Sequence, residues 1–193
     1  MARKKIEFRP DPTGHDWAAK LRLTPLQQKT LLKWVLYSLV CLVGLVLQDS
    51  MLARLRLFGG CFDVTPALIM LICVLEGSEQ GSMFALIGSM IYVFSGTGQG
   101  YYCILLLTLA AVLAASFRQA YLRRSAGSDL ICVGGAMILY ELCIFAVGLF
   151  QGLTYRSRWP VFVMTAIVGT LAAGAVYALL KHIGTIGGNA WKE

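Results

Sequence analysis

The segment LICVGGAMILYELCIFAVGLF, residues 130–150, contains a single charged side chain, Glu141. About 20 consecutive apolar residues form a helix long enough to cross the hydrocarbon core of a bilayer. A carboxylate near the middle of such a helix costs roughly 2.5–3.5 kcal/mol if it faces lipid. The segment therefore predicts a membrane-spanning helix whose glutamate faces the interior of a helix bundle.

Similar apolar blocks recur along the chain of 193 residues, 58% of which are hydrophobic. Soluble domains contain only about 45–50% apolar residues. The other blocks cover about residues 25–47, 66–75, 82–94, 101–117 and 160–180. We predict an all-α polytopic membrane protein with six transmembrane helices. It comprises a basic tail at residues 1–24, a membrane domain at 25–182 and a C-terminal tail at 183–193.

Two prolines mark the starts of predicted helices. Pro25 follows Thr24 and Pro66 follows Thr65, so each threonine is the expected N-cap and each proline lies in a first turn. The helix that begins near Pro66 ends near Leu75, which is short for a span. It either crosses the membrane with little tilt or enters it only in part.

The formal net charge of +7 comes from basic residues that lie beside the apolar blocks. This placement is typical of residues that set membrane orientation and contact anionic lipids, and it argues against nucleic-acid binding. With the N-terminus in the cytoplasm, 13 of the 17 basic residues fall on the cytoplasmic side. The positive-inside rule therefore predicts that both termini are cytoplasmic.

Motifs for catalysis or metal binding are missing from the sequence. It has no Ser/His/Asp set, and its six cysteines form no CxxC or Cys/His cluster. The stretch GTGQG at residues 96–100 lacks the flanking strand and the lysine of a phosphate-binding loop, so we predict a tight turn there. We expect a non-enzymatic protein without catalytic residues, cofactor or metal.

Small residues predict close packing on two helices. In the last apolar block Ala166, Thr170, Gly174 and Ala178 recur every four residues. Gly134 and Gly148 each lie seven residues from Glu141, nearly two helical turns, so all three share one face. Such faces pack against protein rather than lipid, either within this bundle or against a partner.

Glu141 itself has two interpretations. Burial favours the neutral form of its carboxyl group, which could tie helices together through hydrogen bonds. Alternatively, Glu141 lines a polar intramembrane site for a ligand or a partner. Beyond Glu141, Tyr140 and Tyr92 the spans offer few polar side chains for such a site.

Several short motifs follow one another between residues 47 and 142. They are Gln48 and Asp49 in LQDS, Pro66 in PALI, Glu76 with Gly77, then Gly81, Phe84, Gly88, Gly96 and Gly100, LLL at 105–107 and LYEL at 139–142. In this order they resemble the family of the rod shape-determining protein MreD, in its divergent clostridial form, over about residues 45–150. That family usually has an acidic residue shortly after the glycine of the third helix. Residues 88–92 read GSMIY, so that position is altered in this chain.

The resemblance implies a fold like the S components of energy-coupling-factor transporters, in the bacterial cytoplasmic membrane. It implies no enzymatic activity. It implies partnership with MreC, and through MreC with RodA, a class B penicillin-binding transpeptidase and the MreB filament. The protein would then be a scaffold that positions or regulates peptidoglycan synthesis and maintains cell shape.

A rival function is vitamin capture as the S component of such a transporter. Those subunits often carry an Ala-xxx-Ala docking pattern early in the chain. The first span here, LLKWVLYSLVCLVGLVL, has no alanine. A vitamin site would also need several converging polar side chains, and the spans offer few.

Overall fold

The computed structural model describes residues 25–50, 56–57, 60–98, 100–123 and 125–186. Its α-helices are α2 (Pro25–Ser50), α3 (Val64–Glu76), α4 (Ser78–Phe94), α5 (Tyr102–Tyr121), α6 (Ala126–Phe150) and α7 (Trp159–Gly184). The 3-10 turn η2 (Arg156–Arg158) directly precedes α7. Two short strands, β1 (Arg56–Leu57) and β2 (Gly60–Cys61), pair in an antiparallel hairpin. The predicted all-α fold class is confirmed.

Four of these helices are long and apolar enough to cross a membrane, namely α2, α5, α6 and α7. The 13 residues of α3 make a helix of about 20 Å, and the 17 residues of α4 one of about 25 Å. Both are shorter than the roughly 30 Å hydrocarbon core of a bilayer. The four long apolar helices give the chain the composition of a membrane protein. The helices α3 and α4 are shorter than the other four.

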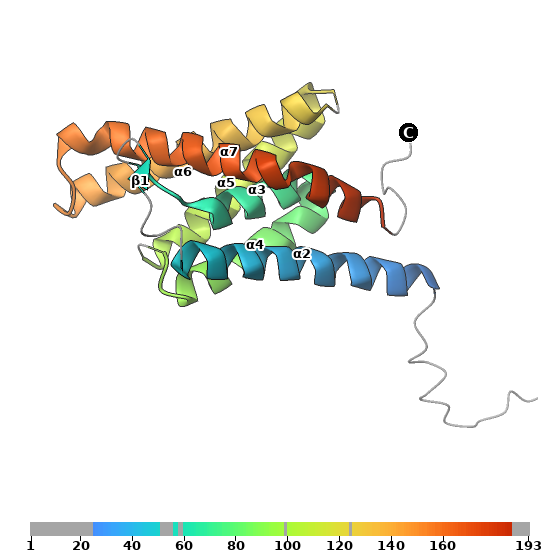
Figure 1. Ribbon diagram of the computed structural model, residues 1–193. Helices are drawn as coiled ribbons and strands as arrows, with labels where there is room; N and C mark the ends of the chain where they lie inside the picture. Colours follow the sequence, from blue (N-terminus) through green and yellow to red (C-terminus); the bar gives the residue numbers. More distant parts are fainter. Residues whose placement is uncertain (1–24, 51–55, 58–59, 99, 124, 187–193) are drawn as a thin grey trace, which may run out of the picture.

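The short helix α3 is the centre of the bundle (Figure 1). It contacts α2, α4, α5, α6 and α7. Every residue from Val64 to Val74 is buried. The sequence of α3 is compatible with this position, because a helix that is apolar around its whole circumference can be covered by neighbours on every side.

The connection between α3 and α4 is a single residue, Gly77, with φ +97°. Only glycine adopts this left-handed conformation without strain. The predicted helix start near residue 82 is therefore wrong, since α4 begins at Ser78. Glu79 in its first turn complements the positive end of the helix dipole, which favours the earlier start.

The tight turn at Gly77 brings α4 directly against α3 at Gly81. A Cβ atom added to Gly81 would lie 2.7 Å from the Cα atom of Cys73 and 2.8 Å from its carbonyl oxygen. These are backbone atoms, so α3 and α4 would have to move apart.

We expect Gly81→Ala to lower the free energy of unfolding by about 1–3 kcal/mol, because the added methyl group overpacks this contact. Gly135→Ala in α6 is the matched control, since a Cβ there meets nothing within 4 Å. The control should be neutral, or stabilising by about 0.5–1 kcal/mol through helix propensity. Reversible unfolding in detergent measures both variants. Equal effects of the two substitutions would show that α3 and α4 are not in close contact at this point.

Several predicted boundaries change at the helix ends. Pro25 opens α2 as predicted, whereas its predicted cap, Thr24, lies outside the described residues with the rest of the tail at residues 1–24. Thr65 is not the cap of α3, since it lies within the first turn and Asp63 precedes the helix. The last helix continues to Gly184, beyond the predicted boundary at residue 182, and residues 187–193 lie outside the described part of the chain.

Candidate functional site

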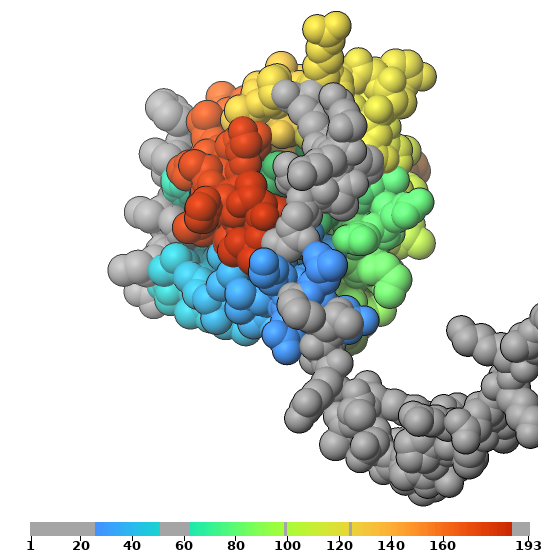
Figure 2. All heavy atoms as spheres, turned by 90° about the vertical axis from the view of Figure 1, so that its right-hand side faces the viewer, coloured from blue at the N-terminus to red at the C-terminus, as the bar shows by residue number. Residues whose placement is uncertain are grey.

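One end of the bundle carries buried charge, where α2 begins and α7 ends beside it (Figure 2). Glu76, the last residue of α3, forms an ion pair with Lys33 of α2. The hydroxyl of Tyr37 donates a second hydrogen bond of 2.7 Å to Glu76 and lies 3.4 Å from the carbonyl oxygen of Leu180 in α7. Lys33, Tyr37 and Glu76 are all buried. This cluster fixes the C-terminal end of α3 between α2 and α7.

A second buried ion pair joins the end of α5 to the start of α6. The Nε atom of Arg118 lies 2.8 Å from Asp129 Oδ1, and the hydroxyl of Tyr177 in α7 donates to Asp129 Oδ2 over 2.9 Å. Both charged side chains are buried. Three helices therefore meet at one carboxylate, Asp129.

The N-terminal end of α3 is capped from another helix. The side-chain oxygen of Gln48 in α2 accepts hydrogen bonds from the backbone N–H groups of Val64 (3.1 Å) and Thr65 (2.9 Å) and from the Thr65 hydroxyl (2.7 Å). Helix N-termini leave such N–H groups without intrahelical partners. Gln48 thus replaces the local cap that the sequence predicted at Thr65.

Asp63 links this cap to α4. It accepts a hydrogen bond of 2.7 Å from the Gln48 amide and one of 2.9 Å from the Tyr92 hydroxyl. Asp63 precedes α3 and lies outside the four helices long enough to span. Desolvation raises the pKa of its carboxyl to about 6, although both hydrogen bonds favour the ionised form.

The predicted polar residues Glu141, Tyr140 and Tyr92 lie around Asp63, close enough for electrostatic interaction. The Tyr140 side chain is 1% exposed, and its hydroxyl has no hydrogen-bond partner among the described residues. The thiol of Cys103, a weak acceptor, lies beside it. Asp63 was not expected in this group, because no periodic pattern connects it to α6.

Glu141 is buried, at 4% exposure, and none of the described residues donates a hydrogen bond to it. The structure therefore contains no tie between helices through this carboxyl within the described residues. Burial disfavours the ionised form of a carboxyl group, so an apolar side chain costs less than a carboxylate at such a position.

We therefore expect Glu141→Leu to leave stability unchanged or to raise it by up to about 3 kcal/mol. Glu79→Leu, at an exposed position of α4, is the control and should lower stability by no more than about 1 kcal/mol, the usual size of a helix-dipole contribution. Thermal unfolding in detergent measures both. A clear loss of stability in Glu141→Leu would mean that the carboxyl has a partner in the folded protein.

The predicted small residues lie mainly between α6 and α7. A Cβ on Gly134 would lie 3.4 Å from the side chain of Thr170, and one on Gly174 would lie 3.7 Å from Leu130. Ala166 is buried and Ala178 is exposed. A Cβ on Gly148 would lie 2.9 Å from the hydroxyl oxygen of Thr154, in the loop that follows α6. Five of these six predicted residues thus face neighbours inside this chain, and Ala178 does not.

The remaining motif residues lie at turns and contacts. Asp49 accepts a hydrogen bond of 3.1 Å from Thr97, and Pro66 lies in the first turn of α3. A Cβ on Gly88 would lie 3.1 Å from Ile69. Gly96 has φ +85°, as the predicted turn requires, and a Cβ on Gly100 would meet the ring of Tyr102 at 2.6 Å.

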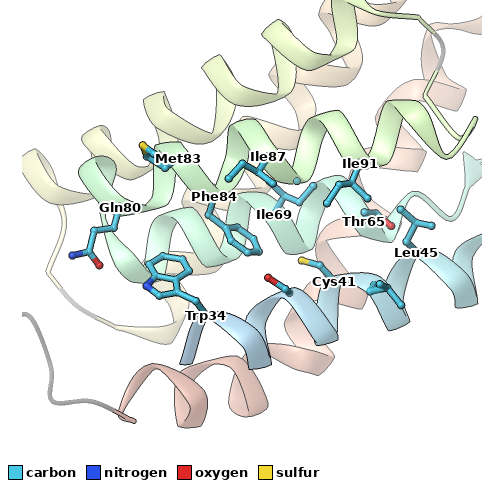
Figure 3. A pocket seen from close by; sticks show the side chains of 13 residues that line it. Trp34, Cys41, Leu45, Thr65, Ile69, Gln80, Met83, Phe84, Ile87 and Ile91 are labelled. Atoms are coloured by element: carbon cyan, nitrogen blue, oxygen red, sulfur yellow. The ribbon is translucent and has the colours of Figure 1, made fainter. Parts of the chain in front are cut away.

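An apolar groove of about 460 Å³ runs between α2 and α4, with α3 as its floor (Figure 3). Trp34 and Phe84 stand at one end, with ring centroids 5.7 Å apart, and Leu45 and Ile91 at the other. Ile69 forms part of the floor. The few polar side chains that line it are Ser38, Thr65 and Gln80. Such a surface suits an apolar occupant.

No protein-family model, curated protein or solved structure matches this chain.

Proposed function

We propose that this chain is a non-enzymatic membrane scaffold of the cell-wall elongation machinery. It would act with MreC to position or regulate peptidoglycan synthesis and so maintain cell shape. The proposal starts from the motifs at residues 47–142 that resemble the MreD family.

The observation that carries the proposal is the role of those motif residues in holding α3. Gln48 caps one end of α3 and Glu76 anchors the other. Gly77 makes the turn that follows, and Gly81 allows α4 to pack against α3. Residues that are engaged in internal contacts build a rigid body rather than a reaction centre. This supports a protein that acts by presenting surfaces to partners.

The apolar groove also favours a scaffold over vitamin capture. Ligand sites for polar small molecules combine apolar walls with several placed polar groups. The groove between α2 and α4 is lined almost wholly by apolar side chains. A protein partner in the membrane fits this lining better than a water-soluble vitamin.

On this proposal the bundle has six spans and both termini are cytoplasmic, with α3 and α4 as short spans. Single cysteines placed in the 96–98 turn and in the 151–158 loop should react with an impermeant thiol reagent added from outside intact cells. A cysteine at residue 123 should not. The reverse labelling pattern would contradict this orientation.

Depletion of the protein in a rod-shaped source organism tests the function. We expect rounded cells, rescued by the wild-type chain and by Glu79→Ala but poorly by Glu76→Ala, which releases one end of α3. Unchanged cell shape after depletion would contradict the scaffold function.

The second candidate function is the S component of a vitamin transporter. The buried Tyr140 and Glu141 beside Asp63 favour it, because they supply polar groups for a ligand. Tight vitamin binding by the purified protein, lost in Tyr140→Phe and Glu141→Leu, together with normal cell shape after depletion, would establish this function instead.

A further inference from the structure

We propose that Asp63 and Glu141 form one buried proton-binding site, and that a proton bound there keeps the C-terminal end of α2 attached to the bundle. This inference goes beyond the proposed scaffold function and does not depend on it. Loss of the proton would release that end of α2, while the Lys33–Glu76 pair holds the other end.

The first observation is the position of the two acids. The backbone carbonyl of Asp63 lies against α7 and α6, since a Cβ added to Gly169 would be 2.7 Å from its oxygen and 3.0 Å from Met137. Glu141 follows Met137 by four residues, so both lie on one face of α6. The carboxyl groups of Asp63 and Glu141 are close enough to interact electrostatically. Glu141 is 4% exposed and receives no hydrogen bond from the described residues, so its carboxyl group is available to a proton.

The second observation is that this pair of acids has no positively charged partner among the described residues. Lys33 and Arg118 are the buried basic side chains there, and each pairs with another acid. Both of these ion pairs lie at the other end of the bundle, where α3 ends and α6 begins (Figure 1). Two neighbouring buried carboxyl groups cannot both ionise without such a partner. The pair therefore retains a proton in the folded protein.

The other groups that face the pair carry no charge. Tyr92 of α4 and Tyr140 of α6 interact with both acids, and the thiol of Cys103 in α5 lies beside Tyr140. α2 contributes the amide of Gln48, which also occupies the backbone N–H groups at the start of α3. α7 contributes Gly169. None of these five residues supplies the positive charge that two ionised carboxylates need.

A proton is the cation that fits this position. Neither the groove between α2 and α4 nor the smaller pocket between α6 and α7 is lined by Asp63 or Glu141. A metal ion needs a cavity with several oxygen ligands, whereas a proton needs none.

The third observation is that Asp63 is an attachment point of α2. Its carboxylate accepts a hydrogen bond from the amide of Gln48, at the end of α2. α2 depends on such points, since only 11% of its most apolar stretch is buried, against 39% in α5, α6 and α7. An ionised Asp63 beside Glu141 is better solvated by water than by the bundle. Ionisation therefore favours movement of Asp63 towards water, and Gln48 would move with it.

The pKa of Asp63 gives the direction of the pH dependence. Desolvation raises it from the usual value of 3.8 to about 6. The folded bundle thus binds the proton more tightly than the unfolded chain does. The resulting stabilisation is complete below pH 3.8 and is lost as the pH rises through about 6. The end of α2 should accordingly be held most firmly in acid.

Thermal unfolding in detergent at a series of pH values is the first test. The melting temperature of the wild-type protein should fall between about pH 5 and about pH 8. Asp63→Asn keeps the shape of the side chain without a titratable group, and should remove at least half of this fall. Asp49→Asn is the matched control, because Asp49 is an exposed acid in the last turn of α2, and it should leave the fall unchanged. An equal fall in Asp63→Asn would overturn the inference.

A pair of spin labels measures the attachment of α2 directly. Labels are placed through Asp49→Cys and Thr97→Cys in a chain without its other cysteines, because these two side chains are 3.1 Å apart at the end of α2. Ser78→Cys with Gln119→Cys is the control pair, since these side chains are 3.0 Å apart between α4 and α5. The population of the first pair at short distance should fall at least twofold between about pH 5 and about pH 8. The control pair should not change.

The same labels in two further variants test the site itself. Asp63→Asn should abolish the fall of the first pair, and Glu141→Gln, which removes the neighbouring charge, should reduce it. A distance between residues 49 and 97 that does not change with pH in the otherwise unaltered chain would overturn the inference. So would a fall that persists in Asp63→Asn or is unaffected by Glu141→Gln. None of these results bears on cell shape, so the scaffold function is tested separately by depletion.

Discussion

Glu76→Ala is expected to lower the free energy of unfolding by about 3–5 kcal/mol. The substitution removes the partner of Lys33, which is buried, and the acceptor of the Tyr37 hydroxyl. Removing one member of a buried ion pair leaves an uncompensated charge away from water. The end of α3 would then lose its attachment to α2 and α7.

Glu79→Ala is the control for this result, because it removes an acidic side chain three residues later from an exposed position. It should lower stability by no more than about 1 kcal/mol, the usual size of a helix-dipole contribution. Glu76→Gln retains hydrogen-bonding atoms but not the charge, and should fall between the two. Denaturant or thermal unfolding in the same detergent measures all three. A loss in Glu76→Ala no larger than in Glu79→Ala would show that the Lys33–Glu76 pair is not formed in the folded protein.

The helices could be predicted from the sequence because each depends on local composition. The block at residues 130–150 is α6 almost unchanged, and its predicted start moved only to Ala126, where Ser125 acts as N-cap. The inward position of Glu141 followed from the glycines on its face. Both inferences use spacing along one helix, which is fixed by helix geometry.

The central position of α3 could not be predicted in the same way. Its shortness suggested a partial span, but the sequence does not say which neighbours surround it. The capping of α3 by Gln48 joins residues 16 and 17 positions apart, and the Lys33–Glu76 pair joins residues 43 positions apart. Such contacts depend on how the helices are arranged in space.

Only part of the candidate site could be predicted, because contacts between helices depend on how the helices are arranged in space. Glu141, Tyr140 and Tyr92 were proposed from their polarity within apolar blocks, and the structure places them around Asp63. Asp63 was not predicted because it lies in the connection that precedes α3, where an acidic residue is common. The groove between α2 and α4 has no sequence signal, since its lining residues are typical of any lipid-facing helix.

Arg118→Leu is expected to lower the free energy of unfolding by a similar amount, about 3–5 kcal/mol, because it leaves Asp129 buried and unpaired. The hydroxyl of Tyr177 would still donate a hydrogen bond to Asp129. Arg123→Leu is the control. Arg123 lies in the connection between α5 and α6, and its substitution should be close to neutral.

The double substitution Arg118→Leu with Asp129→Leu separates two contributions to the free energy of unfolding. One is the net contribution of the intact ion pair, and the other is the penalty for leaving one buried charge without its partner. Replacing both members of a buried ion pair by apolar residues is often neutral or stabilising, since neither charge then needs to leave water. We expect the double variant to recover at least half of the stability that Arg118→Leu loses, as measured by unfolding in detergent. Tyr177 is only half-buried, so its hydroxyl can turn to water when Asp129 is absent. If the double variant were as unstable as the single one, the pair would hold α5 and α6 together by more than charge compensation.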